Sequence, residues 1–130
     1  MTSIEADAGK TEPAVAPHLS LAVDAAGLLF VSGQLAFVEG KLLQGGIAEQ
    51  TRQALANIEA VLAQRGLARR DIVKTTVWIT KRDDFQGFNA AYAEFFGDIR
   101  PARSTVVAEL AIPDALVEIE AIAATQGSAG

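Results

Sequence analysis

Hydrophobic residues near the start of the chain are grouped in short runs. Leu19–Val23 and Leu28–Val31 are separated by Asp-Ala-Ala-Gly, a turn-like composition, so they predict a first β-hairpin. Gly33 interrupts the second run, and a glycine within a strand is typical of a bulge or of a close approach to backbone or ligand. Phe37–Leu42 predicts a turn into a short third strand that ends at Gly45–Gly46.

In the middle of the chain, apolar residues recur at the spacing of two amphipathic helices. Between Ile47 and Arg65 apolar residues recur at helical spacing, and Gly66 is a natural stop. Asp83–Phe96 predicts the second helix, whose acidic start suits the positive end of the helix dipole. The segment between them, Asp71–Thr80, alternates β-branched residues with others and predicts a strand.

The apolar segment Pro101–Ala124 predicts two further strands, because β-branched residues recur near both of its ends. Ala111–Asp114 contains a proline, which presets a turn, so we expect the two strands to form an antiparallel hairpin. In this hairpin Arg103 and Glu118 would project from one face, with room for a small molecule between them. Spacing alone favours the plainer interpretation of a cross-strand ion pair or two solvated charges.

The predicted order is β-β-β-α-β-α-β-β in a single domain. A mixed sheet with both helices on one face is the economical α+β arrangement. The other face would still carry Val, Ile and Ala side chains, and contact with other subunits would bury them. We expect residues 1–12 to be a flexible leader, residues 13–125 to be the domain, and residues 126–130 to be a flexible tail.

Composition narrows the classes of function. The chain has 130 residues, half of them apolar, which is enough for one domain with a real core. A net charge of −5 argues against a nucleic-acid backbone as the main partner, and the lack of cysteine excludes disulfides and thiolate chemistry. No secretory signal and no run of about twenty apolar residues is visible, so we expect no membrane span and a cytoplasmic location.

Most other candidate sites have a plainer interpretation. His18 is the only histidine and has no second ligand at a chelating spacing, so no metal site is expected. Asp83–Asp84 are helix-start charges rather than a magnesium pair, and Gly45–Gly46 lacks the lysine of a phosphate loop. Ser32 has no identifiable His–Asp relay. A basic cluster near the first helix end is a solvated face rather than an RNA contact; it comprises Arg65, Arg69, Arg70 and Lys74.

The C-terminal segment PARSTVVAELAIPDALVEIEAIA resembles the signature of the RidA family, the reactive intermediate deaminases, also called YjgF-type proteins. Further segments resemble this family in the expected order. They are LLFVSGQLAF at 28–37, GGIAEQTRQALANIEAVLAQRGL at 45–67, DIVKTTVWIT at 71–80 and DDFQGFNAAYAEFFG at 83–97. The resemblance covers about residues 13–124. It implies a chorismate-mutase-like fold and a homotrimer with sites in the clefts between subunits.

The resemblance also assigns site residues. Arg103 occupies the PAR arginine and Glu118 the first glutamate of VEIE, while Ser32 and Gly33 occupy the SGQ segment and Asn89 the FxxxN helix. A guanidinium grips a carboxylate with two parallel hydrogen bonds, which suits an anchor for a small imino acid. A partly buried carboxylate can hold a water molecule and relay its proton, which is the role of the glutamate.

These roles imply a cofactor-independent enamine/imine deaminase that hydrolyses small 2-imino acids of the 2-aminoacrylate type to 2-oxo acids and ammonia. Backbone groups near Gly33 and Thr105, with Asn89, would position the imine and the water, and Glu120 is secondary. No metal or organic cofactor is needed, because the substrate is already activated. The alternatives are a deaminase dedicated to another imine, such as aminomuconate, and a non-catalytic small-molecule binding or interaction module. A ribonuclease is the weakest alternative because the chain is acidic.

The chain departs from the common family pattern at several positions. The usual N-terminal tyrosine is absent from Pro17–His18–Leu19–Ser20, and Thr105 stands where many members have cysteine. Glu109 replaces a small residue, and Pro113 lies one place later than usual. We expect the first change to alter substrate preference, and the last two to reshape the loop that closes the pocket.

Overall fold

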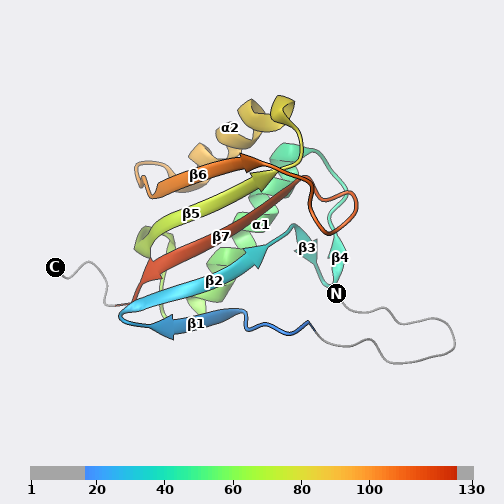
Figure 1. Ribbon diagram of the computed structural model, residues 1–130. Coiled ribbons are helices and arrows are strands. Elements are labelled where there is room, and N and C mark those ends of the chain that lie inside the picture. The colour runs from blue at the N-terminus through green and yellow to red at the C-terminus, as the bar shows by residue number, and fades with distance from the viewer. Residues whose placement is uncertain (1–16, 126–130) are drawn as a thin grey trace, which may run out of the picture.

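A computed structural model describes residues 17–125, which form a five-stranded sheet with both helices packed on one of its faces (Figure 1). The strands are β1 (Ala22–Ala25), β2 (Leu28–Gln34), β3 (Phe37–Val38), β4 (Lys41–Leu42), β5 (Ile72–Ile79), β6 (Ala102–Val107) and β7 (Val117–Ala124). The helices are α1 (Ile47–Ala63) and α2 (Phe85–Phe96), and two single-turn 3₁₀ helices lie at Arg69–Asp71 and Arg82–Asp84. The predicted leader and tail lie outside the described residues.

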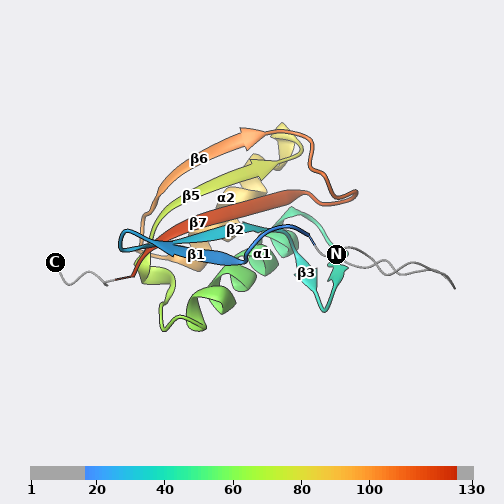
Figure 2. The same cartoon turned by 60° about the horizontal axis from the view of Figure 1, so that its bottom comes forward.

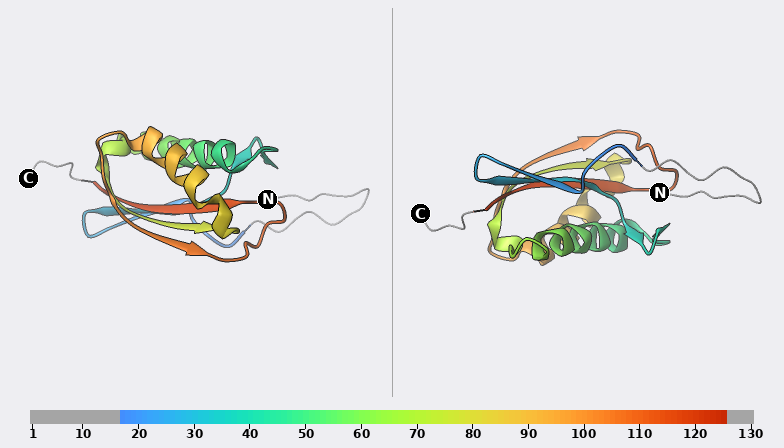
Figure 3. Two further views of the ribbon diagram at one scale, coloured as in Figure 1. Left: turned by 90° about the horizontal axis from the view of Figure 1, so that it is seen from above. Right: turned by 90° about the horizontal axis from the view of Figure 1, so that it is seen from below.

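The predicted α+β fold is confirmed. The first hairpin forms between β1 and β2, and the strand register shifts between Val31 and Gln34, as expected for a bulge at Gly33. The expected third strand is instead a separate two-stranded hairpin of β3 and β4. Figure 3 shows both helices on the same side of the five-stranded sheet.

The predicted hairpin between the last two strands is wrong. The strand order is β1-β2-β7-β5-β6, so β5 lies between β6 and β7 (Figure 2). The connection through α2 brings β6 back parallel to β5, as crossover connections do. The chain from 108 to 116 then carries β7 to the other side of β5, where it pairs antiparallel with both β5 and β2. This central place buries both edges of β7, which a two-stranded hairpin would leave open.

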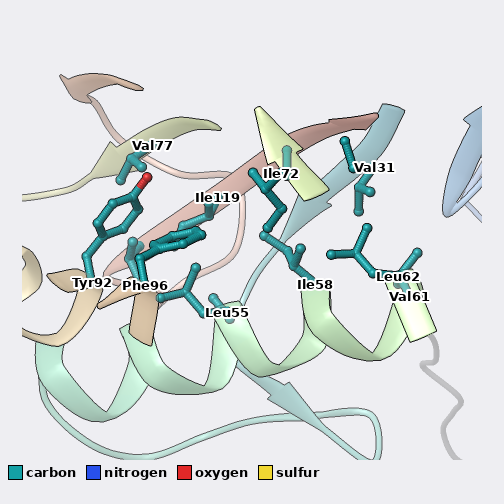
Figure 4. Packing of buried hydrophobic residues seen from close by; sticks show 14 of the residues in the cluster. Val31, Leu55, Ile58, Val61, Leu62, Ile72, Val77, Tyr92, Phe96 and Ile119 are labelled. Carbon is teal, nitrogen blue, oxygen red and sulfur yellow. The ribbon is translucent and has the colours of Figure 1, made fainter. Parts of the chain in front are cut away.

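The core lies between the helices and the covered face of the sheet (Figure 4). Leu55, Ile58 and Leu62 project from α1 and are fully buried. They meet alternate residues of the central strands, such as Val77 and Ile119, which are also fully buried. Because side chains of a strand alternate between faces, the residues in between lie on the opposite, open face.

The open face of the sheet carries apolar side chains that no described residue covers. Val23, Phe30 and Val106 are 51%, 41% and 41% exposed. The strand register places Phe30 opposite Val23 on β1, and Val106 opposite Trp78 on β5. A contiguous apolar sheet face of this kind is typical of a protein–protein contact. Within residues 17–125, no helix is long and apolar enough to cross a membrane.

Candidate functional site

Arg103 lies on the helix-covered face of the sheet, near the edge formed by β6. Its register partner on β5 is the buried Thr75, and paired residues point to the same face. Its Nη1 donates a hydrogen bond of 2.9 Å to Oδ1 of Asn89 on α2. The guanidinium carbon also lies 4.8 Å from the ring centroid of Tyr92 and 5.2 Å from that of Phe88. The amide and the aromatic faces therefore fix the direction of the guanidinium.

Tyr92 supports this arrangement from inside the core. Its hydroxyl and that of the fully buried Thr75 are 2.7 Å apart and share a hydrogen bond. Burial raises the pKa of Tyr92, while the hydrogen bond with Thr75 and the charge of Arg103 act to lower it. Sequence analysis assigned Tyr92 no role beside Arg103. The helical spacing of Asn89 and Tyr92, three residues apart, was the signal available.

Thr105 points to the same face as Arg103, two residues further along β6. Its Oγ1 is buried and has no hydrogen-bond partner within the described part of the chain. Thr105 lines a cavity of about 390 Å³ between β6 and the start of α2. The other lining residues are Ile79, Arg82, Phe85, Gln86 and Val107. Together with Arg103, Asn89 and Tyr92, Thr105 forms what we call the Arg103 half-site.

Glu118 lies on the open face of the sheet. Its register partner on β5 is Trp78, and both line a cavity of about 310 Å³ with Gly33 and Glu120. The loop after β6 closes the cavity with Ala108, Glu109, Leu110 and Ala111. Burial raises the pKa of Glu118, and the neighbouring charge of Glu120 raises it further. Glu118, Gly33, Trp78 and Glu120 form what we call the Glu118 half-site.

Gly33 touches the Glu118 side chain where a larger residue would not fit. A Cβ atom added to Gly33 would lie 3.0 Å from Cδ and 3.2 Å from Cγ of Glu118, and closer still to Oε2. The bulge of β2 therefore supports the carboxylate directly. The neighbouring Ser32 is engaged elsewhere, because its hydroxyl donates a hydrogen bond of 2.6 Å to the carbonyl of Ser20.

The prediction that Arg103 and Glu118 flank one cavity within a single chain is wrong. Their register partners, Thr75 and Trp78, are three residues apart on β5 and therefore point to opposite faces. The prediction assumed that β6 and β7 pair with each other. In the structure each pairs with β5 instead, and this different register places Arg103 and Glu118 on opposite faces. The structure thus brings Asn89 and Thr105 to Arg103, and Gly33 and Glu120 to Glu118, but separates the two groups by the sheet.

The basic cluster and His18, the other candidates from the sequence, show no sign of a binding site in the described part of the chain. Arg69 makes two hydrogen bonds to the carboxylate of Glu59, at 2.7 and 2.9 Å, and Arg65 pairs with Asp24. His18 is exposed. Between residues 17 and 125 no group of three or more His, Cys, Asp or Glu side chains is arranged to hold a metal ion.

Comparisons with known proteins agree with this fold. The family model described as Endoribonuclease L-PSP matches residues 9–125. A RutC family protein of Pyrococcus horikoshii is 42% identical over 106 residues, covering 80% of this chain and 84% of that protein. The crystal structure of YyfA from Yersinia pestis, of the conserved Rid protein family, has 44% identity and a TM-score of 0.76, covering 86% of this chain and 90% of that one. Escherichia coli TdcF with bound serine has 36% identity and a TM-score of 0.75, covering 85% and 90%.

Proposed function

Because the chain belongs to the Rid (YjgF, L-PSP) family, we propose that it is a cofactor-independent deaminase of small 2-imino acids. The family predicted from the sequence is thereby confirmed, while the reaction is our proposal. The related TdcF structure holds serine, an amino acid with the carboxylate and α-nitrogen that a 2-imino acid also carries. The proposed products are a 2-oxo acid and ammonia.

One observation carries the proposal: neighbouring side chains hold the Arg103 guanidinium in a fixed direction, but none of them is a carboxylate that pairs with its charge. Asn89 and the rings of Phe88 and Tyr92 hold it, and Arg103 makes no salt bridge to another residue between 17 and 125. Its other N–H groups remain to grip a substrate carboxylate with two parallel bonds. Such a contact fixes the orientation of the acid and thus of its C=N carbon.

Glu118 supplies the proton transfers. A water molecule held by the carboxylate adds to the C=N carbon, and Glu118 takes one of its protons as the new C–O bond forms. Glu118 then gives this proton to the nitrogen, which yields a carbinolamine with one hydroxyl and one amino group. In a second relay Glu118 moves the hydroxyl proton to the amino group, so that the C–N bond breaks and ammonia leaves as the C=O bond forms. The raised pKa of Glu118 makes its carboxylate a stronger base than an ordinary glutamate, which suits its acceptance of the water proton.

The two half-sites meet if neighbouring subunits contribute one each. Since they lie on opposite faces of the sheet, the contact joins different surfaces of two copies, and such contacts form a ring when the rotation between the copies closes. The exposed apolar face of the sheet supplies surface for this contact. A homotrimer is the ring that we propose, with one composite site at each of its interfaces.

The family description names an endoribonuclease, so RNA is the competing substrate. The net charge of −5 and the pairing of Arg65 with Asp24 and of Arg69 with Glu59 speak against a phosphate-binding surface. A deaminase dedicated to another imine and a non-catalytic binding module remain as alternatives. The first would hydrolyse its own imine but not 2-aminoacrylate, and the second would bind a ligand without turnover.

The experiment generates 2-aminoacrylate in place and follows release of the keto acid. We expect the wild-type protein to accelerate release, and Arg103→Ala or Glu118→Ala each to lower the acceleration by about 100-fold or more. Arg65→Gln, which removes one charge at an ion pair remote from both half-sites, is the control and keeps the activity. Equal rates with and without protein would end the proposal for this imine. RNA cleavage that survives Glu118→Ala would favour the ribonuclease instead.

A further inference from the structure

A third cavity beside the Arg103 half-site brings a second arginine next to Arg103. It has a volume of about 260 Å³ and lies between the end of α2 and the start of β6. Its lining residues are Asn89, Tyr92, Ala93, Phe96, Gly97, Ile99, Arg100, Pro101 and Arg103. Two guanidinium-bearing residues thus line one cavity, and the lining set includes no aspartate or glutamate.

We propose that Arg100 forms a second anion subsite, and that the preferred substrates are 2-imino dicarboxylates. This inference rests on the proposed function, because Arg103 is taken to hold the carboxylate next to the C=N bond. Arg100 would then hold the carboxylate at the far end of the substrate. The apolar side chains of Ala93, Phe96 and Ile99 line the space that its methylene groups would fill.

The electrostatics favour an anion in this cavity. Two like charges that face one space repel each other, and an anion between them converts this repulsion into attraction. Neither Arg100 nor Arg103 makes a salt bridge to any residue from 17 to 125. Arg103 is already fixed by Asn89, whereas Arg100 is exposed and its long side chain is free to follow a ligand. The residues are three apart, a span of about 10 Å in extended chain.

The rigid start of β6 holds this pair together. Pro101 follows Arg100 directly and fixes its own φ, which limits how the backbone between the two arginines can move. Side chains of α2, such as Ala93 and Phe96, form one wall of the cavity, so charge–charge attraction beside them is moderately stronger than in bulk water. A ligand with one negative charge engages Arg103 alone, and a ligand with two engages both arginines.

The test uses two imines that differ only at the far end. 2-Iminoglutarate, made in place from glutamate by an amino-acid oxidase, ends in a carboxylate, and 2-iminopentanoate, made from norvaline, ends in a methyl group. Semicarbazide captures the imine that the protein has not hydrolysed. We expect wild-type kcat/KM to be about five- to tenfold higher for 2-iminoglutarate, the size of one charge-assisted hydrogen-bonded contact at an accessible site.

Arg100→Gln should remove most of this preference, while Arg65→Gln, which removes the same charge near the opposite sheet edge, should retain it. The preference should also weaken as salt is added, because the subsite is open to solvent. A wild-type protein without the preference, or a preference that survives Arg100→Gln, would overturn the inference.

Calorimetric titration with the oxo acids separates failure of the inference from failure of the proposed function. 2-Oxoglutarate and 2-oxopentanoate are the matched probes, and neither requires turnover. If the wild-type protein hydrolyses neither these imines nor 2-aminoacrylate, the proposed function fails, and the titration alone tests the Arg100 subsite. Tighter binding of 2-oxoglutarate that is lost in Arg100→Gln would support the subsite, and equal affinities would overturn it.

Discussion

Gly33 shows how a missing side chain decides where a carboxylate can lie. Alanine at this position would press its Cβ against Cγ, Cδ and Oε2 of Glu118. We expect Gly33→Ala to lower the free energy of unfolding by only about 1 kcal/mol, because the atom that it would overlap most is the end of the Glu118 side chain, which can turn into the cavity. Because the carboxylate must move, imine hydrolysis should fall by about 100-fold. Denaturant titration and the 2-aminoacrylate assay measure the two effects.

The same substitution in a Glu118→Ala background is the control for this contact. Removing the Glu118 side chain beyond Cβ also removes the three atoms that the new methyl group would meet. The stability cost of Gly33→Ala should then largely disappear, and this non-additivity identifies the pair as directly coupled. An unchanged cost in both backgrounds would mean that the backbone of the bulge, not Glu118, opposes alanine.

Glu120 should set part of the pH dependence through Glu118. The pKa of Glu118 is raised above its ordinary value of 4.5 first by burial and then by the charge of Glu120. If the ionised form of Glu118 activates the water, kcat/KM falls as the pH drops through this raised pKa. Glu120→Gln removes the repulsion, so the pKa of Glu118 decreases and the acidic limb of the profile should move to lower pH.

Full pH profiles of the wild type and Glu120→Gln provide the measurement. Glu94→Gln on α2 is the matched control, because Glu94 is an exposed glutamate paired with Arg52 and does not line the Glu118 cavity. Its acidic limb should coincide with that of the wild type. A limb that stays in place in Glu120→Gln would show that another group controls the profile.

At the scale of elements, Gln50 connects α1 to the loop that closes the Glu118 cavity. It is 2% exposed, and its Nε2 donates to the carbonyls of Leu43 and Asp114. Its Oε1 accepts a hydrogen bond of 2.9 Å from the backbone N–H of Leu116. Sequence reasoning missed this residue, because a glutamine within an amphipathic helix gives no sign of partners more than sixty residues away.

Gln50→Leu should therefore loosen the connection between β6 and β7. It leaves three backbone groups without their partner, and each buried unsatisfied group costs about 1–3 kcal/mol. We expect a loss of about 2–4 kcal/mol in the free energy of unfolding, since part of the loop will reach water. Hydrogen exchange at the Leu116 amide should accelerate. Gln53→Leu, which loses only a hydrogen bond to Asn57 on the same helix, should cost a few tenths of a kcal/mol.

The last three strands show which parts of the fold local pattern could predict. Because strand side chains alternate between faces, the sequence of β6 places Arg103 with Thr105, and that of β7 places Glu118 with Glu120, as the structure does. It said nothing of which strand lies between them, because pairing depends on contacts far apart in sequence. The signal available in the sequence was the apolar residue at every second position of β7, and the structure buries all four; they are Val117, Ile119, Ala121 and Ala123.

At the scale of the whole molecule, the proposed composite site would make activity depend on two chains. A chain with Arg103→Ala keeps the Glu118 half-site, and a chain with Glu118→Ala keeps the Arg103 half-site. Each alone should be inactive in the imine assay. In a mixed assembly, however, an interface is intact whenever the first variant supplies the glutamate and the second supplies the arginine.

Random mixing of equal amounts should restore about a quarter of wild-type activity, because each half-site is intact with a chance of one half. The restored fraction does not depend on the number of subunits, so analytical ultracentrifugation supplies that number separately. Joint refolding or co-expression achieves the mixing, and simple addition without exchange of subunits is the control. No recovery after verified exchange would mean that the two half-sites never form one site, and the proposed composite site would have to be abandoned.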